Sequence, residues 1–345
     1  MNGASDFRSD TVTRPTAAMR AAMAAAEVGD DVLDGDPTVK ELEARAAEFL
    51  GKDGALFVPS GTMANQVALG AWTRSGDEIL VEREAHVVRW EAGAAGFLHG
   101  VQSVTLSSVR GAMDPGEVRA TIRPDFIHCP RTALICVEQT HMGSGGSVVP
   151  LANLEAIAKV AREHAIPVHM DGARLANAAV ASRIAASRYA ACADSVSLCF
   201  SKGLGAPVGS VIAGSADFLA RAKVVRKRLG GWMRQSGLIA AGALHALEHH
   251  VERLADDHAL AKELARALHG LPGLACPPEA VETNLVLVQV THAELDGAAL
   301  AAKFKEHGVL VSALSPRVLR FVTHLDVGPK DVERTARAAR SILAG

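Results

Sequence analysis

The chain has 345 residues, 49% of them hydrophobic, which is enough for about two domains of ordinary size, each with its own core. Its 36 basic and 38 acidic side chains give a formal net charge of −2 without segregated runs, which disfavours nucleic acid and anionic membrane surfaces as partners. Charged residues interrupt the N-terminal segment, and no run reaches the roughly 20 apolar residues of a membrane span, so we expect a cytoplasmic protein.

Short apolar or β-branched runs alternate with helical patterns over roughly the first 215 residues, which is typical of a mostly parallel sheet covered by helices. Alanine-rich Thr16–Ala26 favours a helix. Asp36 and Pro37 are typical of a helix start, and Pro150 begins a helix that runs to about His164. The candidate strands are Ala55–Val58, Glu78–Val81, Ala133–Val137, Ile166–Met170, Val196–Phe200 and Gly209–Ala213.

The C-terminal part has a different order of elements. From Trp232 to about Leu268 an alanine- and leucine-rich pattern predicts a bridging helix or a broken helix pair. We expect an N-terminal arm and helix over residues 1–30, a large cofactor-binding α/β domain over 31–250 and a small α+β domain over 251–345. The elements predicted for the small domain are strand Asn284–Val290, helix Glu294–His307, strands Val309–Ser312 and Val318–Val322, and a last helix from Lys330.

A lysine follows one of the buried-strand patterns. The run that starts at Ser195 leads directly into Ser201 and Lys202, which two nearby glycines follow. Open α/β sheets bind their ligands at the carboxyl ends of the strands, and a desolvated lysine there is suited to Schiff-base chemistry. Lys202 is therefore a candidate for covalent attachment of a cofactor. The alternative is a lysine that extends from the strand end into solvent.

A second strand pattern, Ile166–Met170, ends in Asp171, with Arg174 shortly after it. Pyridoxal phosphate acts as an electron sink while its ring nitrogen is protonated, and a neighbouring carboxylate maintains that proton. One helix and one strand fit between Asp171 and Lys202, so neighbouring strands can deliver both groups to one ring. The alternative for Asp171 is a turn that caps a helix.

A third pattern is a strand, a tight turn of Ser60, Gly61 and Thr62, and a helix start. The free backbone N–H groups and hydroxyls of such a turn form a phosphate cradle. Ordinary helix capping also explains the tripeptide. The order of phosphate turn, acidic strand end and lysine strand end is what indicates a function.

These motifs resemble the threonine aldolases of the low-specificity L-type, within the fold-type I pyridoxal-phosphate enzymes. The likeness covers nearly the whole chain. It implies the aspartate-aminotransferase-like α/β fold, with a mostly parallel seven-stranded sheet and a small C-terminal α+β domain. The matching stretches are Phe7–Pro15, Val28–Val32 with Asp36–Thr38, Ser60–Thr62, His86 with Glu91–Gly93, Glu138–His141, His169–Arg174, Ser201–Gly205, Met233–Gly237 and Arg320–Asp326.

The resemblance also implies roles for the matching residues. Lys202 would hold pyridoxal 5′-phosphate as a Schiff base, Asp171 would face the ring nitrogen, and His86 would stack on the ring. His86 and His128 are the candidate bases for a substrate β-hydroxyl. The cofactor-binding set is Ser60, Gly61, Thr62, His86, Asp171, Arg174, Ser201, Lys202 and Arg234, the last from a neighbouring subunit. The substrate carboxylate would be bound by Ser9, Arg174 and Arg320.

The activity that the resemblance implies is reversible retro-aldol cleavage of L-threonine or L-allo-threonine to glycine and an aldehyde. It would take place in a homodimer or homotetramer with shared active sites, and would serve threonine catabolism and glycine biosynthesis. A β-eliminating amino-acid lyase on the same scaffold is the alternative, because cofactor residues identify the coenzyme more firmly than the bond cleaved. Leu33 and Val87–Trp90 depart from the family pattern; Trp90 is a candidate pocket wall or subunit-boundary residue.

A metal centre is the remaining alternative class. His245, Glu248 and His249 match the H-x-x-E-H pattern of inverted zinc peptidases. The pattern is short, lies in an alanine-rich helix and has no marked third ligand. The five cysteines form no Cys-x-x-Cys pair, which favours reduced core thiols over disulfides or zinc ligands. We therefore predict no metal site.

Overall fold

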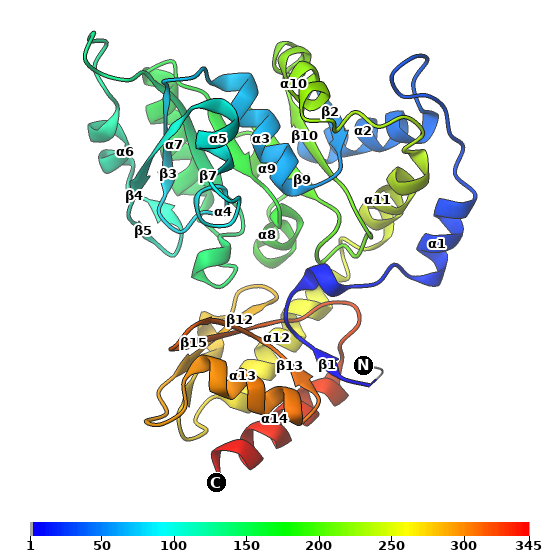
Figure 1. Cartoon of the computed structure of the whole chain (residues 1–345), viewed down its shortest axis with the longest axis vertical. Coiled ribbons are helices and arrows are strands. Elements are labelled where there is room, and N and C mark those ends of the chain that lie inside the picture. The colour runs from blue at the N-terminus through cyan, green and yellow to red at the C-terminus, as the bar shows by residue number, and fades with distance from the viewer. Residues whose placement is uncertain (1–2, 345) are drawn as a thin grey trace.

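The computed structural model describes residues 3–344, and a seven-stranded sheet is the centre of its larger unit (Figure 1). The strand order is β2-β10-β9-β8-β7-β3-β4. Strand β10 is antiparallel to both neighbours, and the pairs from β9 to β4 are parallel, which confirms the predicted fold class. The strands are β2 (Gly54–Val58), β3 (Glu78–Glu82), β4 (Gln102–Leu106), β7 (Thr132–Glu138), β8 (Val168–Asp171), β9 (Ser195–Cys199) and β10 (Ser210–Gly214).

All six strands predicted for this sheet are present, and edge strand β4 was missed. The residues of β4 are mostly exposed, and its sequence mixes polar and apolar side chains. The predicted strands were recognised by continuous apolar runs, which mark strands that are buried on both faces. Edge strand β4 lacks that signal, whereas the other edge strand, β2, is mostly buried and has it.

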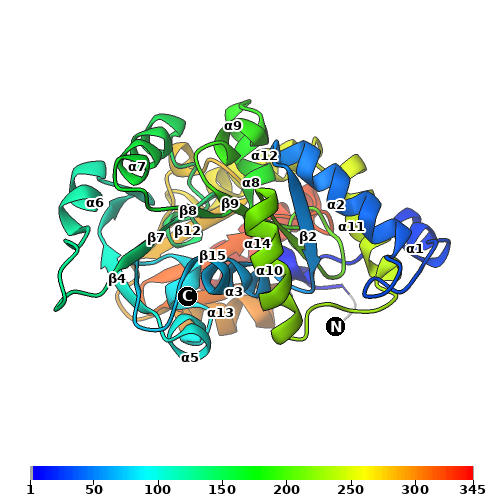
Figure 2. The same cartoon turned by 90° about the horizontal axis from the view of Figure 1, so that it is seen from above.

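Helices cover both faces of the large sheet (Figure 2). Alternate residues of β7 enter opposite cores: Ile135 and Val137 pack in the layer that includes α7, while Leu134 and Cys136 pack in the layer that includes α3 and α5. The segments around the sheet are α2 (Pro37–Leu50), α3 (Gly61–Trp72), α4 (His86–Arg89), α5 (Ala94–His99), β5 (Ser108–Val109), β6 (Ala112–Met113), α6 (Pro115–Thr121), η2 (Met142–Ser144), α7 (Leu151–Glu163), α8 (Leu175–Ser182), α9 (Ala186–Ala190) and α10 (Ala216–Arg228).

Local sequence sets the predicted helix starts. The Asp36 carboxylate accepts the N–H of Val39, and Pro37 occupies the first turn of α2. Helix α7 starts directly after Pro150, as expected. The long segment from Trp232 to Leu268 is a broken pair, α11 (Gly237–His249) and α12 (Leu254–Leu268).

The smaller unit contains a four-stranded antiparallel sheet of order β11-β12-β15-β14. The predicted strand Val309–Ser312 is split, because β13 pairs in parallel with the N-terminal strand β1 instead (Figure 1). The division at residues 30 and 250 stays a prediction. The remaining elements are β1 (Ser5–Asp6), η1 (Asp10–Val12), α1 (Ala17–Ala24), β11 (Leu274–Ala275), η3 (Pro278–Ala280), β12 (Leu285–Val290), α13 (Gly297–Glu306), β13 (Val309–Leu310), β14 (Ser312–Ser315), β15 (Val318–Val322) and α14 (Pro329–Leu343).

Over residues 3–344, none of the helices has both the length and the apolar character that crossing a membrane requires.

Candidate active site

Asp171 and Lys202 lie at the carboxyl ends of two neighbouring parallel strands. Asp171 is the last residue of β8, and Lys202 follows β9. Burial raises the pKa of Asp171, but the charges of Lys202 and His86, with hydrogen bonds from Asn65 and the Ala173 amide, lower it overall. Asp171 is therefore held as a carboxylate, which is the state that keeps a pyridine nitrogen protonated.

A hydrogen-bond network fixes the Asp171 carboxylate. Asn65 Nδ2 donates to Asp171 Oδ2 at 2.8 Å, and the Ala173 N–H donates to Oδ1 at 3.0 Å. Asn65 Oδ1 lies 3.1 Å from His169 Nε2 and accepts the Ser197 hydroxyl at 3.2 Å. Sequence reasoning gave Asn65 no role. An asparagine on a helix has no distinctive sequence signal.

His86 begins α4 and lines the same cavity as Lys202. Its Nδ1 lies 2.9 Å from Glu91 Oε1, and its backbone N–H donates to Glu138 Oε2 at 2.9 Å. Burial lowers the pKa of His86, but the Glu91 hydrogen bond and the Asp171 charge raise it overall. The Glu91 carboxylate thus holds the ring, Glu138 holds the His86 backbone, and the residue borders the cavity.

The Ser60–Thr62 turn connects β2 to α3. Ser60 is the N-cap of α3, and its hydroxyl accepts the Met63 N–H at 3.2 Å, so Ser60 does cap the helix. A Cβ on Gly61 would lie 2.5 Å from Cys199 Sγ at the end of β9, so only glycine fits here. The Ser60 and Thr62 side chains are exposed, which leaves this helix N-terminus open to an anion.

Two arginines line a cavity of about 390 Å³ beside Lys202 and His86. The Arg320 Nε is buried and has no hydrogen-bond partner among the described residues. Burial and the like charge of Arg174 lower the pKa of Arg320. An unsatisfied buried donor next to a second cation suits an anionic ligand such as a carboxylate. Ser9, Thr11, Trp90 and Met142 also line this cavity.

Arg174 is anchored by Asp10, a residue that sequence reasoning missed. Arg174 Nε and Nη2 donate to the two Asp10 oxygens at 2.8 and 2.7 Å, and both side chains are buried. Asn284 Nδ2 also donates to Asp10, at 3.1 Å. Burial raises the pKa of Asp10, but the Arg174 charge and hydrogen bonds lower it well below its usual range. This pair joins the N-terminal arm to the start of α8, just after β8.

His128 and Arg234 are among the predicted site residues that do not line this cavity. His128 is exposed on the loop before β7, at the amino end of that strand, and its ring contacts Phe126 at a centroid distance of 5.0 Å. Arg234 is exposed and pairs with Asp30 at 3.1 Å. A single chain does not bring these residues to Lys202, and their roles stay predictions.

The zinc-peptidase pattern gathers no third ligand in the part of the chain that the structure describes. The Glu248 carboxylate of this pattern forms an ion pair with Arg45, with 3.7 Å between Oε1 and Nε. Over residues 3–344, the only group of three or more potential metal-binding side chains is His86, Glu91 and Asp171.

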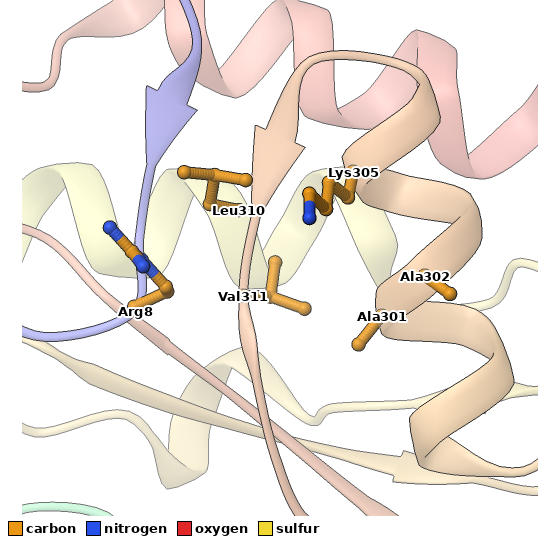
Figure 3. Close-up of a pocket in the computed structure, with 6 residues that line it drawn as sticks. All are labelled: Arg8, Ala301, Ala302, Lys305, Leu310 and Val311. Carbon is orange, nitrogen blue, oxygen red and sulfur yellow. The ribbon is translucent and has the colours of Figure 1, made fainter. Parts of the chain in front are cut away.

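A second cavity, of about 270 Å³, lies in the smaller unit between β13, α13 and the N-terminal arm (Figure 3). Arg8 and Lys305 stand on opposite sides of β13 there, with Leu310 and Val311 between them. Arg8 already pairs with Asp6, and the Lys305 side chain is exposed. This cavity has no buried polar group to hold a ligand.

The residues present fit pyridoxal phosphate: Lys202 is the amine, Asp171 is the carboxylate for the ring nitrogen, and the Gly61 turn is an open anion cradle. The fold and the site together define a pyridoxal-phosphate enzyme of fold type I.

The chain belongs to the beta-eliminating lyase family, whose model matches residues 6–292. It is 43% identical to a probable low-specificity L-threonine aldolase 2 of Arabidopsis thaliana, over 95% of this chain and 94% of that one. It is 42% identical to the low specificity L-threonine aldolase of Escherichia coli (strain K12), over 98% and 99% of the two chains. The chain is thus a pyridoxal-phosphate-dependent lyase, and the resemblance to threonine aldolases is confirmed.

Solved structures share the fold. The threonine aldolase of Leishmania major superposes with a TM-score of 0.83 at 18% identity, covering 98% of this chain and 99% of that one. A putative aromatic amino acid beta-eliminating lyase/threonine aldolase from Exiguobacterium sp. 255-15 gives 0.80 at 24% identity, covering 94% of each chain.

Proposed function

We propose that this chain is a low-specificity L-threonine aldolase, which cleaves L-threonine or L-allo-threonine to glycine and acetaldehyde and also catalyses the reverse reaction. The observation that carries the proposal is the cavity of about 390 Å³ in which Lys202, His86, Arg174 and Arg320 meet. Relatives at 42–43% identity over nearly their whole length are named as aldolases of this type.

The two arginines and Ser9 would bind the substrate carboxylate. Arg174 has two of its nitrogens engaged by Asp10, so it would offer Nη1, while Arg320 would offer its unpaired Nε. Holding the carboxylate at this end of the cavity fixes the rotation about the substrate Cα. The β-hydroxyl would then lie on the side of His86.

Pyridoxal phosphate bound at Lys202 supplies the electron sink for the chemistry at Cα. Asp171 would hold the proton on the ring nitrogen, and the Ser60–Thr62 turn would hold the phosphate, with Arg234 of a second copy. His86 would accept the β-hydroxyl proton as the Cα–Cβ bond breaks. The electron pair of that bond would stay with Cα, and the Cβ fragment would be released as the aldehyde. His128 of a second copy, or a water molecule, is the other candidate base.

We propose a homodimer or homotetramer with shared active sites. Arg234 and His128 lie outside the cavity of their own chain, and residues Trp90, Phe97 and Ile127 are 53%, 88% and 88% exposed. Large exposed apolar side chains of this kind favour subunit contacts. The proposed location is the cytoplasm, supported by five free cysteines, and the proposed roles are threonine catabolism and glycine biosynthesis.

A β-eliminating lyase is the second candidate, favoured by the name of the matching family. Steady-state kinetics on L-threonine, L-allo-threonine and phenylserine test the main proposal, with Lys202→Ala as the inactive control. We expect aldehyde release from all three substrates and none from the variant. Aldehyde release that survives in Lys202→Ala would overturn the assignment of Lys202.

A further inference from the structure

A buried carboxylate without an assigned role lies behind His86. The Glu91 side chain is 0% exposed, on the segment between α4 and α5. A buried charge persists only when it is paired or well hydrogen-bonded. Neighbouring donors must therefore stabilise the Glu91 carboxylate, and the carboxylate can in turn orient those donors.

Three donors surround the Glu91 carboxylate. Asn65 Nδ2 donates to Oε1 at 2.8 Å, and Gln66 Nε2 donates to Oε2 at 2.7 Å. His86 Nδ1 lies 2.9 Å from Oε1. Both amide groups donate N–H bonds to Glu91, and an ionised carboxylate can only accept hydrogen bonds, so the His86 contact requires a proton on Nδ1. A neutral His86 then carries its lone pair on Nε2, which has no protein partner among the described residues.

Asn65 connects this pair to the cofactor carboxylate. The same Nδ2 group that donates to Glu91 donates to Asp171 Oδ2, also at 2.8 Å. Ligand atoms of His86, Glu91 and Asp171 all lie within 4.8 Å of one another. A metal ion is a poor occupant for this cluster, because the Asn65 N–H groups point at both carboxylates and would repel a cation.

We propose that Glu91 is a positioning residue that keeps the neutral His86 protonated on Nδ1, so that Nε2 is available in the cavity as the proton acceptor, while Asn65 fixes Glu91 and Asp171 relative to each other. Before the reaction, His86 donates its Nδ1–H to Glu91. When the substrate O–H bond breaks, its proton forms the Nε2–H bond and the O–H electron pair becomes part of the aldehyde C=O. The Cα–Cβ bond breaks at the same time, and its electron pair stays with Cα. The resulting imidazolium is paired with Glu91, as a base needs.

Charged groups face His86 from several elements. Burial lowers the pKa of His86. Glu91, from the segment between α4 and α5, and Asp171, from β8, raise this pKa, whereas Lys202, after β9, lowers it. Glu138 of β7 accepts the His86 backbone N–H. The overall pKa is raised, and the Glu91 hydrogen bond is the largest contribution in that direction. Removing the Glu91 charge should therefore move the His86 titration to lower pH.

The tautomer can be tested directly on the wild-type holoenzyme. Solid-state NMR of ¹⁵N-histidine-labelled protein, assigned with a His86→Gln spectrum, should show the neutral His86 protonated on Nδ1. A proton on Nε2 would overturn the proposal. This readout needs neither a Glu91 variant that folds nor any aldol activity.

The kinetic part of the inference rests on the proposed function. In Glu91→Gln we expect kcat to fall by about tenfold or more, since a general base contributes roughly 10²–10⁴. The acid limb of the kcat profile should also move to lower pH. Glu91→Asp, which keeps the charge, should restore the position of that limb. Glu163→Gln, at an exposed carboxylate, is the matched control and should change neither quantity.

The outcomes separate the two claims. If Glu91→Gln lowers kcat without moving the acid limb, Glu91 has only a structural role and the inference fails while the aldolase proposal stands. If the wild type releases no aldehyde but its neutral His86 is protonated on Nδ1, the aldolase proposal fails while the positioning by Glu91 stands.

Discussion

Replacing Asp10 with asparagine tests the ion pair that anchors Arg174. The two side chains are 0% and 5% exposed, and two hydrogen bonds of 2.8 and 2.7 Å join them. Asparagine keeps the shape but removes the charge, so a buried guanidinium loses its counterion. Removing one partner from a buried pair costs about 3–5 kcal/mol. We expect a loss of about 3 kcal/mol, at the low end, because the amide oxygen still accepts one N–H. Urea unfolding followed by tryptophan fluorescence measures it.

The pH dependence of this loss has a defined sign. Burial raises the pKa of Asp10, but Arg174 lowers it overall in the folded state. A carboxyl with a lowered folded pKa contributes stability above its unfolded value of about 3.9, and loses that contribution as the pH falls further. The difference between wild type and Asp10→Asn should thus be constant from about pH 8 to 5 and narrow below about pH 4.

The control is Glu163→Gln, which breaks an exposed pair with Arg119. Exposed pairs contribute little, so its unfolding curve should overlay that of the wild type. If Asp10→Asn is no less stable than this control, or if its deficit is the same at acid and neutral pH, the pair does not have the role that its geometry implies.

The remaining predictions concern the cofactor and the substrate. Borohydride treatment of the yellow holoenzyme should add the cofactor mass to the peptide that contains Lys202, and peptide mass spectrometry of Lys202→Ala should show no such adduct. Gly61→Ala should weaken pyridoxal-phosphate binding, because its Cβ would lie 2.5 Å from Cys199 Sγ, and Cys199→Ala in the same chain should restore part of it; equal cofactor titrations of both would contradict this. Arg320→Lys should raise KM for L-threonine by about tenfold or more with a smaller change in kcat, since a lysine cannot replace a guanidinium fork; an unchanged KM would remove Arg320 from the carboxylate site.

The sequence predicted the fold class and the residues at the ends of β8 and β9, because local sequence patterns indicate both. Buried parallel strands appear as continuous apolar runs. Asp171 ends one of these strands, and Lys202 follows shortly after the end of another. The residue types of Ser60, Gly61 and Thr62 likewise predict the turn. Such features can be recognised without knowing which distant residues pack against them.

The supporting residues were missed because their partners are distant in the chain. Asp10 meets Arg174 across 164 residues, and Asn65 meets Asp171 across 106. Glu91 lies in a matching stretch, yet its contact with Gln66 appears only when α3 and the segment after α4 are packed together. Which of several acidic residues is buried beside a cation depends on that packing.

Products from purified holoenzyme and L-threonine test the central claim most directly. Amino-acid analysis combined with an aldehyde assay should find glycine and acetaldehyde in equal amounts. Formation of 2-oxobutanoate and ammonia in their place would contradict the account, because it would show that this site breaks the bond to the β-oxygen and leaves Cα–Cβ intact.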